Sequence, residues 1–422
     1  MRKLLADKRA IARKTMGIII AVVIVIAAVS VYAYQMLSGP SGVFKIGVLL
    51  PFTGAYGIQA IEQRDAFLLA LEEINQAGGI LGKRAEAVIY DDQLKVDVAL
   101  TLVNRLVEVD KVDVLAGALS ASTAAALNDK AKELNIPYFA FCLMGRDGFT
   151  KAKLAKGTWN ILGSGWDNGY VDAYFLTHNL TDVRKVYIII PAYSFGYDCR
   201  DGFLAGLQQW GQNIEVLGII ECPVGTADFS PYLSTIMAAN PDLIFTAQAG
   251  NDATNFLRQA NLMGVQQRVK ILQPWSWILE YAGLPAEATL NVYFTFWYFW
   301  NAPEAAVREY GERFRAKYGR YPDNFGGFVY EFTKEMARLI NLAGSTDPTA
   351  IEQAASNNPT FMTMKGQARW GRADHRPVMN NYLYIGTGKP AANRTNYYDV
   401  VEVITSYGGE DFLIPLSQLG YP

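Results

Sequence analysis

Residues 44–57 read Phe-Lys-Ile-Gly-Val-Leu-Leu-Pro-Phe-Thr-Gly-Ala-Tyr-Gly, and this stretch decides the fold. Its apolar run through Leu50 predicts a buried strand, and Pro51 and Gly54 predict that a loop follows it. A helical pattern follows, with Phe67, Leu68, Leu71 and Ile74 on one face, and it ends at a Gly-Gly pair. The folded part of the chain therefore opens with a strand, a loop and a helix.

Short β runs and amphipathic helices then alternate as far as residue 273. Runs such as Val186–Ile190 are apolar throughout, as expected of strands that are covered on both faces. This pattern predicts a parallel, doubly wound α/β plan. Strands are predicted at residues 45–50, 85–90, 113–117, 138–141, 185–190, 214–221, 243–247 and 269–273.

The alternation is interrupted once, at residues 158–169, which divides the chain into two βα blocks. An aromatic strand at 292–300, helices at 303–317 and 326–342, and a β-rich tail follow these blocks. A chain of 422 residues is also too long to form a single core. We therefore expect two α/β domains.

The opening strand and loop resemble those of the substrate-binding proteins of ABC importers for branched-chain amino acids and amides. The similarity continues in Glu73–Gly82, which reads EINQAGGILG, and in Tyr90-Asp-Asp92. It implies the type I periplasmic binding fold, in which two doubly wound Rossmann-like lobes are joined by a hinge of three crossing strands. The implied division is lobe 1 at 43–161 plus 296–366 and lobe 2 at 162–291 plus 370–422.

The N-terminal segment predicts a membrane anchor or a signal. Residues 1–16 are strongly basic, and residues 17–34 carry no charge over a length just sufficient to cross the ~30 Å hydrocarbon layer. Flanking cations stay on the cytoplasmic side. We expect a cytoplasmic segment at 1–16, a single transmembrane helix or signal at 17–36, and the remaining chain outside the cell membrane. Cleavage near Val31-Tyr-Ala33 would instead give a secreted protein.

Composition disfavours nucleic acid, metal and catalysis. Acidic residues outnumber basic ones beyond the N-terminal segment, which argues against nucleic acid as a partner. The chain has two histidines, His178 and His375, and no CxxC or Cys/His pattern with metal-ligand spacing. We therefore expect a binding protein with no cofactor and no metal, not an enzyme.

The three cysteines suggest one disulfide. Cys199 lies at the start of a predicted helix and Cys222 at the end of the next strand, so both belong to one edge of the predicted sheet. An oxidising exterior permits them to pair. We predict a Cys199–Cys222 disulfide and a buried free thiol at Cys142.

Candidate ligand-binding residues follow the strand that ends near Gly117. Ser120, Ser122 and Thr123 open a helix, where free N–H groups and hydroxyls can hold a carboxylate. Simple N-capping is the alternative interpretation. The resemblance implies that a serine at Ser120 holds the substrate.

The resemblance implies further contacts in three other loops. Cys142 and Met144 stand where the family binds substrate through main-chain groups and a threonine, which Met144 replaces. Tyr56 and Phe195 match aromatic residues of the family's cleft, although each could simply be a packing residue. Trp166 and Gln248 are also predicted to contact the ligand.

The most informative departure is Trp275, in the segment Gln-Pro-Trp-Ser-Trp. Family members that bind α-amino acids often carry a carboxylate there, which pairs with the substrate ammonium. A buried ammonium without a partner is costly, although a tryptophan face or a nearby acid (Asp167, Asp252 or Glu280) could compensate. Because Ala249 also replaces an aromatic residue of the family, we favour a neutral amide, a carboxylic acid or an aromatic compound.

The resemblance implies a function in transport. The protein would capture a small solute outside the cell by closing its lobes, and would deliver it to the permease and ATPase subunits of an ABC importer. A ligand-sensing receptor ectodomain and a surface structural subunit are alternatives. The receptor is disfavoured because the cytoplasmic segment is too short for an output domain.

Overall fold

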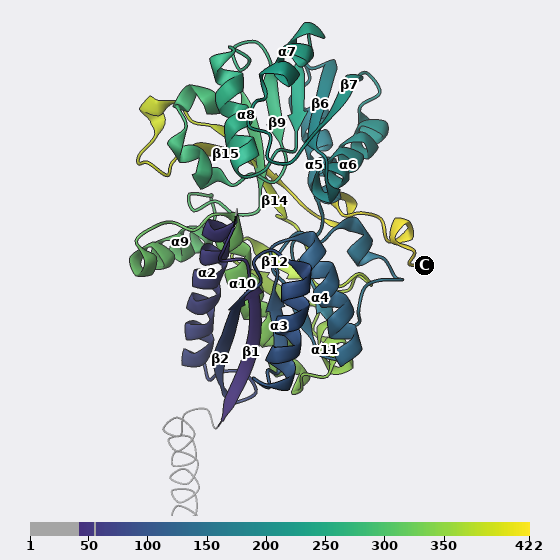
Figure 1. Ribbon diagram of the computed structural model, residues 1–422, viewed down its shortest axis with the longest axis vertical. Coiled ribbons are helices and arrows are strands. Elements are labelled where there is room, and N and C mark those ends of the chain that lie inside the picture. Colours follow the sequence, from purple (N-terminus) through teal and green to yellow (C-terminus); the bar gives the residue numbers. More distant parts are fainter. Residues whose placement is uncertain (1–41, 55) are drawn as a thin grey trace, which may run out of the picture.

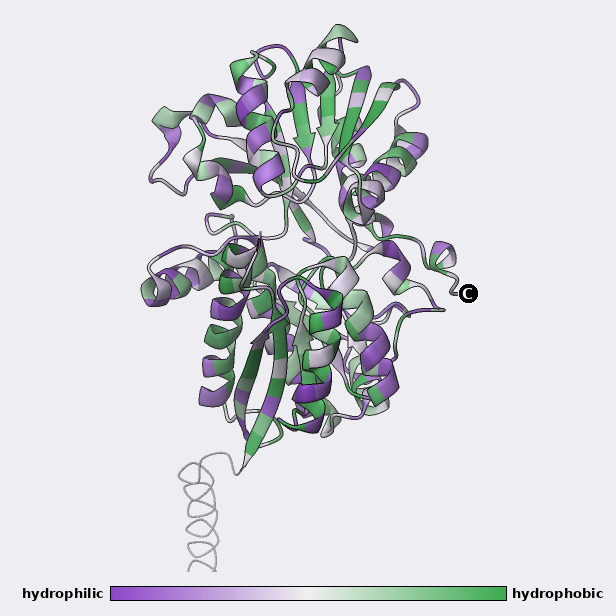
Figure 2. Cartoon of the chain, in the orientation of Figure 1, coloured by the Kyte–Doolittle hydropathy of each residue, from purple (hydrophilic) through white to green (hydrophobic). Residues whose placement is uncertain are grey.

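The computed structural model describes residues 42–54 and 56–422. They form two α/β lobes, one above the other in Figure 1, and both lobes are hydrophobic along their strands (Figure 2). The predicted basic segment 1–16 and the predicted anchor or signal 17–36 lie outside the described residues. Among the helices of the described ranges, none combines the length and the apolar character that a membrane span requires.

Lobe 1 is built on a five-stranded parallel sheet of order β2-β1-β3-β4-β5. Phe44 and Val48 of β1 pack in the core that includes α2 and α10, whereas Leu49 packs with α3 and α4. Helices thus cover both faces of the sheet. The strands are β1 (Val43–Leu50), β2 (Arg84–Asp91), β3 (Val114–Gly117), β4 (Tyr138–Ala140) and β5 (Thr158–Trp159). The helices are α2 (Gly57–Gln76), α3 (Val96–Glu108), α4 (Ala121–Leu134), α9 (Ala305–Tyr318), α10 (Asn324–Ala343) and α11 (Pro348–Asn357).

Lobe 2 has a seven-stranded mixed sheet of order β15-β14-β10-β9-β8-β6-β7. The strands from β10 to β7 are parallel as predicted, and the two tail strands are antiparallel to their neighbours. Its strands are β6 (Lys185–Pro191), β7 (Glu215–Cys222), β8 (Leu243–Thr246), β9 (Lys270–Gln273), β10 (Val292–Phe296), β14 (Leu383–Gly388) and β15 (Val401–Tyr407). Its helices are α5 (Gly165–Asn179), α6 (Ser194–Trp210), α7 (Ser230–Ala238) and α8 (Asn251–Leu262).

Helices α5 and α6 approach closely because glycines face each other's backbones. A Cβ atom on Gly202 would lie 1.9 Å from the Trp166 carbonyl oxygen, and one on Gly169 would lie 2.0 Å from the Cys199 carbonyl oxygen. No larger residue fits either position without a backbone shift. This contact fixes α6, and with it Phe195, relative to the first crossing between the lobes.

The last third of the chain contains a small additional sheet, the third crossing between the lobes and a final return to lobe 1. A small sheet of β11 (Thr360–Thr363), β12 (Gly366–Arg369) and β13 (Val378–Met379) packs beside lobe 1, where Trp370 contacts Trp159 of β5 with ring centroids 5.1 Å apart. The third crossing therefore follows β13. After β15 the tail returns to lobe 1, and the Leu419 carbonyl accepts a 3.0 Å hydrogen bond from the Lys151 N–H. Short 3-10 helices complete the chain at Arg146–Phe149, Ile278–Gly283, Ala286–Thr289, Ala391–Asn393, Glu410–Phe412 and Leu416–Leu419.

The predicted disulfide is wrong: Cys199 and Cys222 are both free thiols. Cys199 is fully buried against the start of α5, where its sulfur lies 3.0 Å from the position a Cβ would take on Gly165. The Cys222 thiol instead donates to the Ile190 carbonyl at 3.4 Å. The two side chains engage different elements although they lie near one edge of the sheet. Cys142 is a buried free thiol, as predicted.

Candidate functional site: a cleft between the lobes

A cavity of about 350 Å³ lies between the lobes, where the loops that follow the parallel strands meet. Lobe 1 contributes the start of α4 and the loops around Tyr56, Leu94 and Leu143. Lobe 2 contributes the start of α6 and the loops around Val224, Ala249 and Trp275. The carboxyl ends of strands are where α/β folds generally bind ligands. Its volume is at the small end of the usual range for ligand pockets, ~300–1,000 Å³.

Ser120 both caps helix α4 and lines the cavity, so the two interpretations of this residue from the sequence both apply. It is the N-cap of α4, and its Oγ accepts a 3.1 Å hydrogen bond from the Thr123 N–H. It also lines the cavity with Ala121 and Ser122, whose Oγ lies 3.1 Å from that of Ser120. Thr123 is fully buried and does not line the cavity, so it supports Ser120 from behind.

A second helix begins at the same cavity. Helix α6 starts at Ser194, and Tyr193, Ser194 and Phe195 all line the cavity. Neither α4 nor α6 carries an acidic residue in its first turn. The first N–H groups of a helix have no backbone partner within it, and at α4 the Ser120 cap engages only that of Thr123. Two helix starts, each with a partial positive charge, therefore meet here.

Aromatic side chains form most of the remaining wall. Trp275 lies 6.0 Å from Phe325, and Trp277 lies 5.7 Å from Tyr56, measured between ring centroids. The backbone of Trp275 has φ +50°, in the left-handed region that non-glycine residues rarely adopt. Such strain costs about 1–3 kcal/mol and persists where surrounding contacts hold it, often at functional sites. The aromatic residues of the lining are Tyr56, Tyr193, Phe195, Trp275, Trp277 and Phe325.

The three acids considered as partners for a ligand ammonium are all engaged elsewhere. Asp252 accepts a 2.8 Å hydrogen bond from the Gly225 N–H, and Glu280 accepts one from the Gln59 side chain. Burial raises the pKa of Glu280 to about 8 and also raises the pKa of Asp252. Asp167 pairs with Arg376 at 2.7 Å. None of the cavity's lining residues within the described part of the chain is charged.

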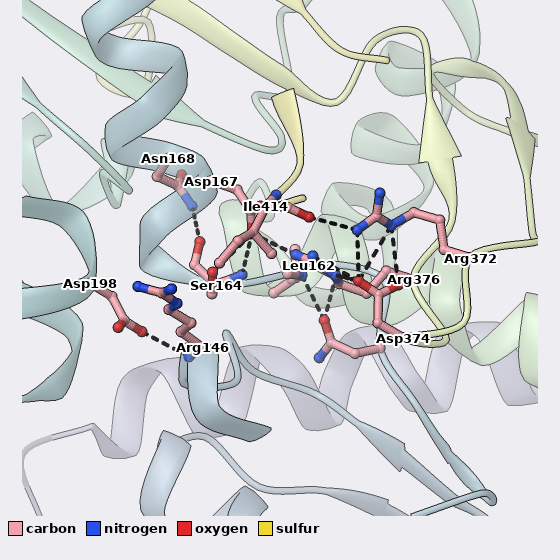
Figure 3. Close-up of polar contacts among 12 residues, drawn as sticks. Arg146, Leu162, Ser164, Asp167, Asn168, Asp198, Arg372, Asp374, Arg376 and Ile414 are labelled. Atoms are coloured by element: carbon pink, nitrogen blue, oxygen red, sulfur yellow. Dashed lines mark hydrogen bonds and ion pairs between the residues drawn. The ribbon is translucent and has the colours of Figure 1, made fainter. Parts of the chain in front are cut away.

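Asp167 belongs to a buried ionic network at the hinge, which Figure 3 shows. Asp374 lies 2.9 Å from both Arg372 and Arg376, and Arg376 also binds Asp167. Asp167 accepts from the Ile414 N–H at 2.8 Å, and Arg372 donates to the Ile414 carbonyl at 2.7 Å. Burial opposes ionisation of Asp374, but its two arginines hold its pKa below the ordinary value. The network ties the start of α5, the loop between β12 and β13, and the tail together.

The structure brings five of the ten predicted ligand-binding residues to the cavity: Tyr56, Ser120, Ser122, Phe195 and Trp275. The others lie outside its lining and are almost completely buried: Thr123, Cys142, Met144, Trp166 and Gln248. Trp166 stacks on Tyr170 at 4.5 Å, and the Gln248 amide donates to the Cys222 sulfur at 3.1 Å.

Sequence reasoning missed several lining residues. Tyr193 and Ser194 adjoin the predicted Phe195, and Trp277 lies two residues after Trp275, so the same loops could have identified them. Phe325 gave no local signal because it comes from the start of α10, in another part of the chain. The remaining lining residues missed are Leu94, Leu119, Ala121, Leu143 and Val224.

Residues 43–391 match the family described as "Periplasmic binding protein". A relative in Brucella abortus (strain 2308), "Leu/Ile/Val-binding protein homolog 7", is 24% identical, and the match covers 78% of this chain and 85% of the relative.

Solved structures share the architecture. An amino acid ABC transporter substrate-binding protein from Pseudomonas fluorescens Pf-5 superposes with a TM-score of 0.81 at 23% identity, covering 90% of this chain and 99% of its own. A solute-binding protein of an ABC transporter from R. palustris, in complex with benzoate, superposes with a TM-score of 0.74 at 20% identity, covering 88% and 99%. At these identities the likeness shows the fold.

Proposed function

This chain belongs to the periplasmic binding protein family, and we propose that it captures a small organic solute between its lobes as the binding component of an ABC importer. The observation that carries this proposal is the cavity of about 350 Å³, to which both lobes contribute loops at their strand ends. A ligand held by both lobes favours the closed form over the open one, because only the closed form makes all the contacts.

The solute we propose is a branched-chain amino acid-like compound, an amide or a carboxylate. Relatives bear the name Leu/Ile/Val-binding protein, and one neighbour of the same fold was solved with benzoate. The start of α4, with Ser120 and Ser122, suits a carboxylate or carbonyl oxygen. The apolar wall suits the rest of a small organic molecule.

We further propose that the protein works outside the cell membrane and binds its solute without chemical conversion. Residues 17–36 would anchor it, or would be removed as a signal, and permease and ATPase subunits would receive the solute. Among the described residues, no group of His, Cys, Asp and Glu is arranged to hold a metal ion. The uncharged lining of the cavity offers no acid–base pair for catalysis.

A screen of amino acids, amides and organic acids by thermal shift, followed by small-angle scattering, tests the proposal. A bound solute should stabilise the protein by about 2.7 kcal/mol at a 100-fold excess over Kd. The same solute should compact the protein by closing the lobes. Phe195→Ala, in the cavity, should abolish both responses, whereas Tyr397→Ala, at a side chain 63% exposed, should preserve them. Stabilisation without compaction would contradict closure.

A further inference from the structure

The cleft distinguishes between ligand charges through its helix starts, not through charged side chains. Helices α4 and α6 both begin at the cavity, and neither has an acid in its first turn. A third helix, α8, begins beside it, but Asp252 lies in that helix's first turn. Two uncompensated helix N-termini therefore give the cavity a positive potential although no lysine or arginine lines it.

A buried N–H group without a hydrogen-bond partner agrees with this positive potential. Trp277 lines the cavity and is only 6% exposed, and its indole N–H is buried with no hydrogen-bond partner among the described residues. An indole N–H can only donate, so any ligand group that reaches it must be an acceptor, such as an oxygen, and not an ammonium. The Ser120 and Ser122 hydroxyls lie 3.1 Å apart and can both direct a proton toward an acceptor. Every polar side chain of the lining can therefore donate a hydrogen bond.

The cavity offers no counter-charge for a cation. Of the two acids that act on the lining residue Tyr56, Asp252 is bound to the Gly225 N–H and Glu280 to the Gln59 amide across the lobes. Neither acid lines the cavity, and burial raises the pKa of Glu280 to about 8. An α-ammonium placed here would lose its water without gaining a carboxylate, and isolated charges are expensive to bury.

The walls favour a planar, apolar body. Trp275, Trp277 and Phe325 form one contiguous aromatic cluster, with Trp277 and Phe325 centroids 5.4 Å apart. Phe195 and Tyr193 bring two more rings from the start of α6, with centroids 6.0 Å apart. Aromatic rings stack well against one another and bury large areas.

We infer that the site selects an aromatic or otherwise apolar monocarboxylate that lacks an α-ammonium group. The carboxylate lies at the starts of α4 and α6, and the body lies against the aromatic wall. This inference rests on the proposed function and sharpens it, since it excludes the α-amino acids that the name of a relative suggests.

Ligand pairs that differ only in the ammonium group test this directly. Calorimetry with the full chain should give 3-phenylpropanoate an affinity about 100-fold or more above that of phenylalanine, because only the amino acid buries an unpaired charge. The same order should hold for 4-methylpentanoate over leucine. The inference would be overturned if the two members of a pair bound equally well or if the amino acid bound more tightly. It would also be overturned if none of the four compounds bound.

A charge placed at the start of α4 gives a second test. Ser122→Asp adds a carboxylate to the first turn of a helix, where it stabilises the fold, but it should repel a bound carboxylate. We expect at least a tenfold loss of 3-phenylpropanoate affinity with unchanged or higher thermal stability. Ser122→Asn has nearly the same size without the charge and should lose less. Equal losses for the two variants would contradict the proposed position of the carboxylate.

Failure of this inference can be distinguished from failure of the proposed function. If neither carboxylate of the pairs binds but another solute both stabilises and compacts the protein, the ligand class is wrong and solute capture stands. If no solute in the screen compacts the protein, the proposed function fails as well.

Discussion

The cleft and the hinge network are both buried, yet the hinge network contains paired charges and the cleft lining contains none. The hinge joins Asp167, Arg372, Asp374 and Arg376 through short ion pairs, with side chains no more than 4% exposed. The cleft is lined by uncharged residues and relies on helix starts and hydroxyls. Burying charges costs several kcal/mol per ion unless each is fully paired. Permanent pairs suit a hinge whose geometry must persist, whereas a cleft that opens and closes would repeatedly lose and regain such pairs.

The largest effect should come from breaking the hinge network. Asp167→Ala removes one partner of Arg376 and the acceptor of the Ile414 N–H. We expect the free energy of unfolding, measured in urea, to fall by about 3–5 kcal/mol because a buried charge is left partly uncompensated. Glu133→Ala breaks the exposed pair with Lys130 and should change it by less than about 1 kcal/mol. Similar losses for the two variants would show that burial of the network does not matter.

The next effect separates binding from stability in the cleft. Trp275→Ala removes a large part of the aromatic wall and should weaken ligand binding by about 2–4 kcal/mol, as buried aromatic contacts typically do. Trp370→Ala is a matched control, because Trp370 is equally buried but lies between Phe361 and Trp159, away from the cleft. Both variants should unfold more easily, and only Trp275→Ala should change Kd in calorimetry. A change of Kd in the control would mean that binding merely follows overall stability.

Regular, local patterns could be predicted from the sequence, and long-range ones could not. Strand β1 and helix α2 followed from residues 44–79 because their apolar period and turn residues are local. The antiparallel direction of β14 depends on its pairing with β10, about ninety residues away, which no local pattern encodes. The Cys199–Cys222 prediction failed because a position at one sheet edge does not fix where a side chain points.

The same division holds for the candidate site. Ser120, Ser122, Phe195 and Trp275 could be located because loops after parallel strands meet at one edge. The engagement of Asp167 with Arg376 joins residues more than two hundred positions apart, so the sequence left that acid available to a ligand. Phe325 was missed for the same reason.

A smaller effect concerns the start of helix α4, which contributes a partial positive charge to the cleft. Ser120→Ala removes a hydroxyl that lines the cavity and caps α4, and should weaken carboxylate binding by about 1–2 kcal/mol. It should also cost about 1 kcal/mol of stability through the lost cap. Asp347→Ala removes the N-cap of α11, which accepts from Thr349 and Ala350 N–H groups at 3.0 Å, and should cost similar stability without affecting Kd. Equal Kd values for both variants would remove Ser120 from the ligand site.

The last effect is smallest near pH 5, grows with pH, and tests whether the cleft's surroundings are kept uncharged. Glu280 joins the lobes by accepting from Gln59, and its pKa is raised from 4.5 to about 8, mainly by burial and in part by the nearby Glu62. The folded protein therefore binds this proton more tightly than the unfolded chain does, so Glu280 lowers stability progressively as pH rises from about 4.5 to about 8. Glu280→Gln keeps an acceptor for Gln59 and should change the free energy of unfolding by less than about 0.5 kcal/mol near pH 5.

As pH rises from about 5 to about 8 the variant should become progressively more stable than the natural protein, because it has no carboxyl to ionise inside the fold. The difference between their stability curves isolates Glu280, since Glu62 and Asp323, whose pKa values are also raised by burial, titrate in both proteins. Urea unfolding between about pH 5 and pH 9 measures that difference. Parallel curves would show that Glu280 ionises as readily in the fold as in the unfolded chain. A charged carboxylate would then be available beside Tyr56, and the argument that the cleft has no counter-charge for an ammonium would fail at that residue.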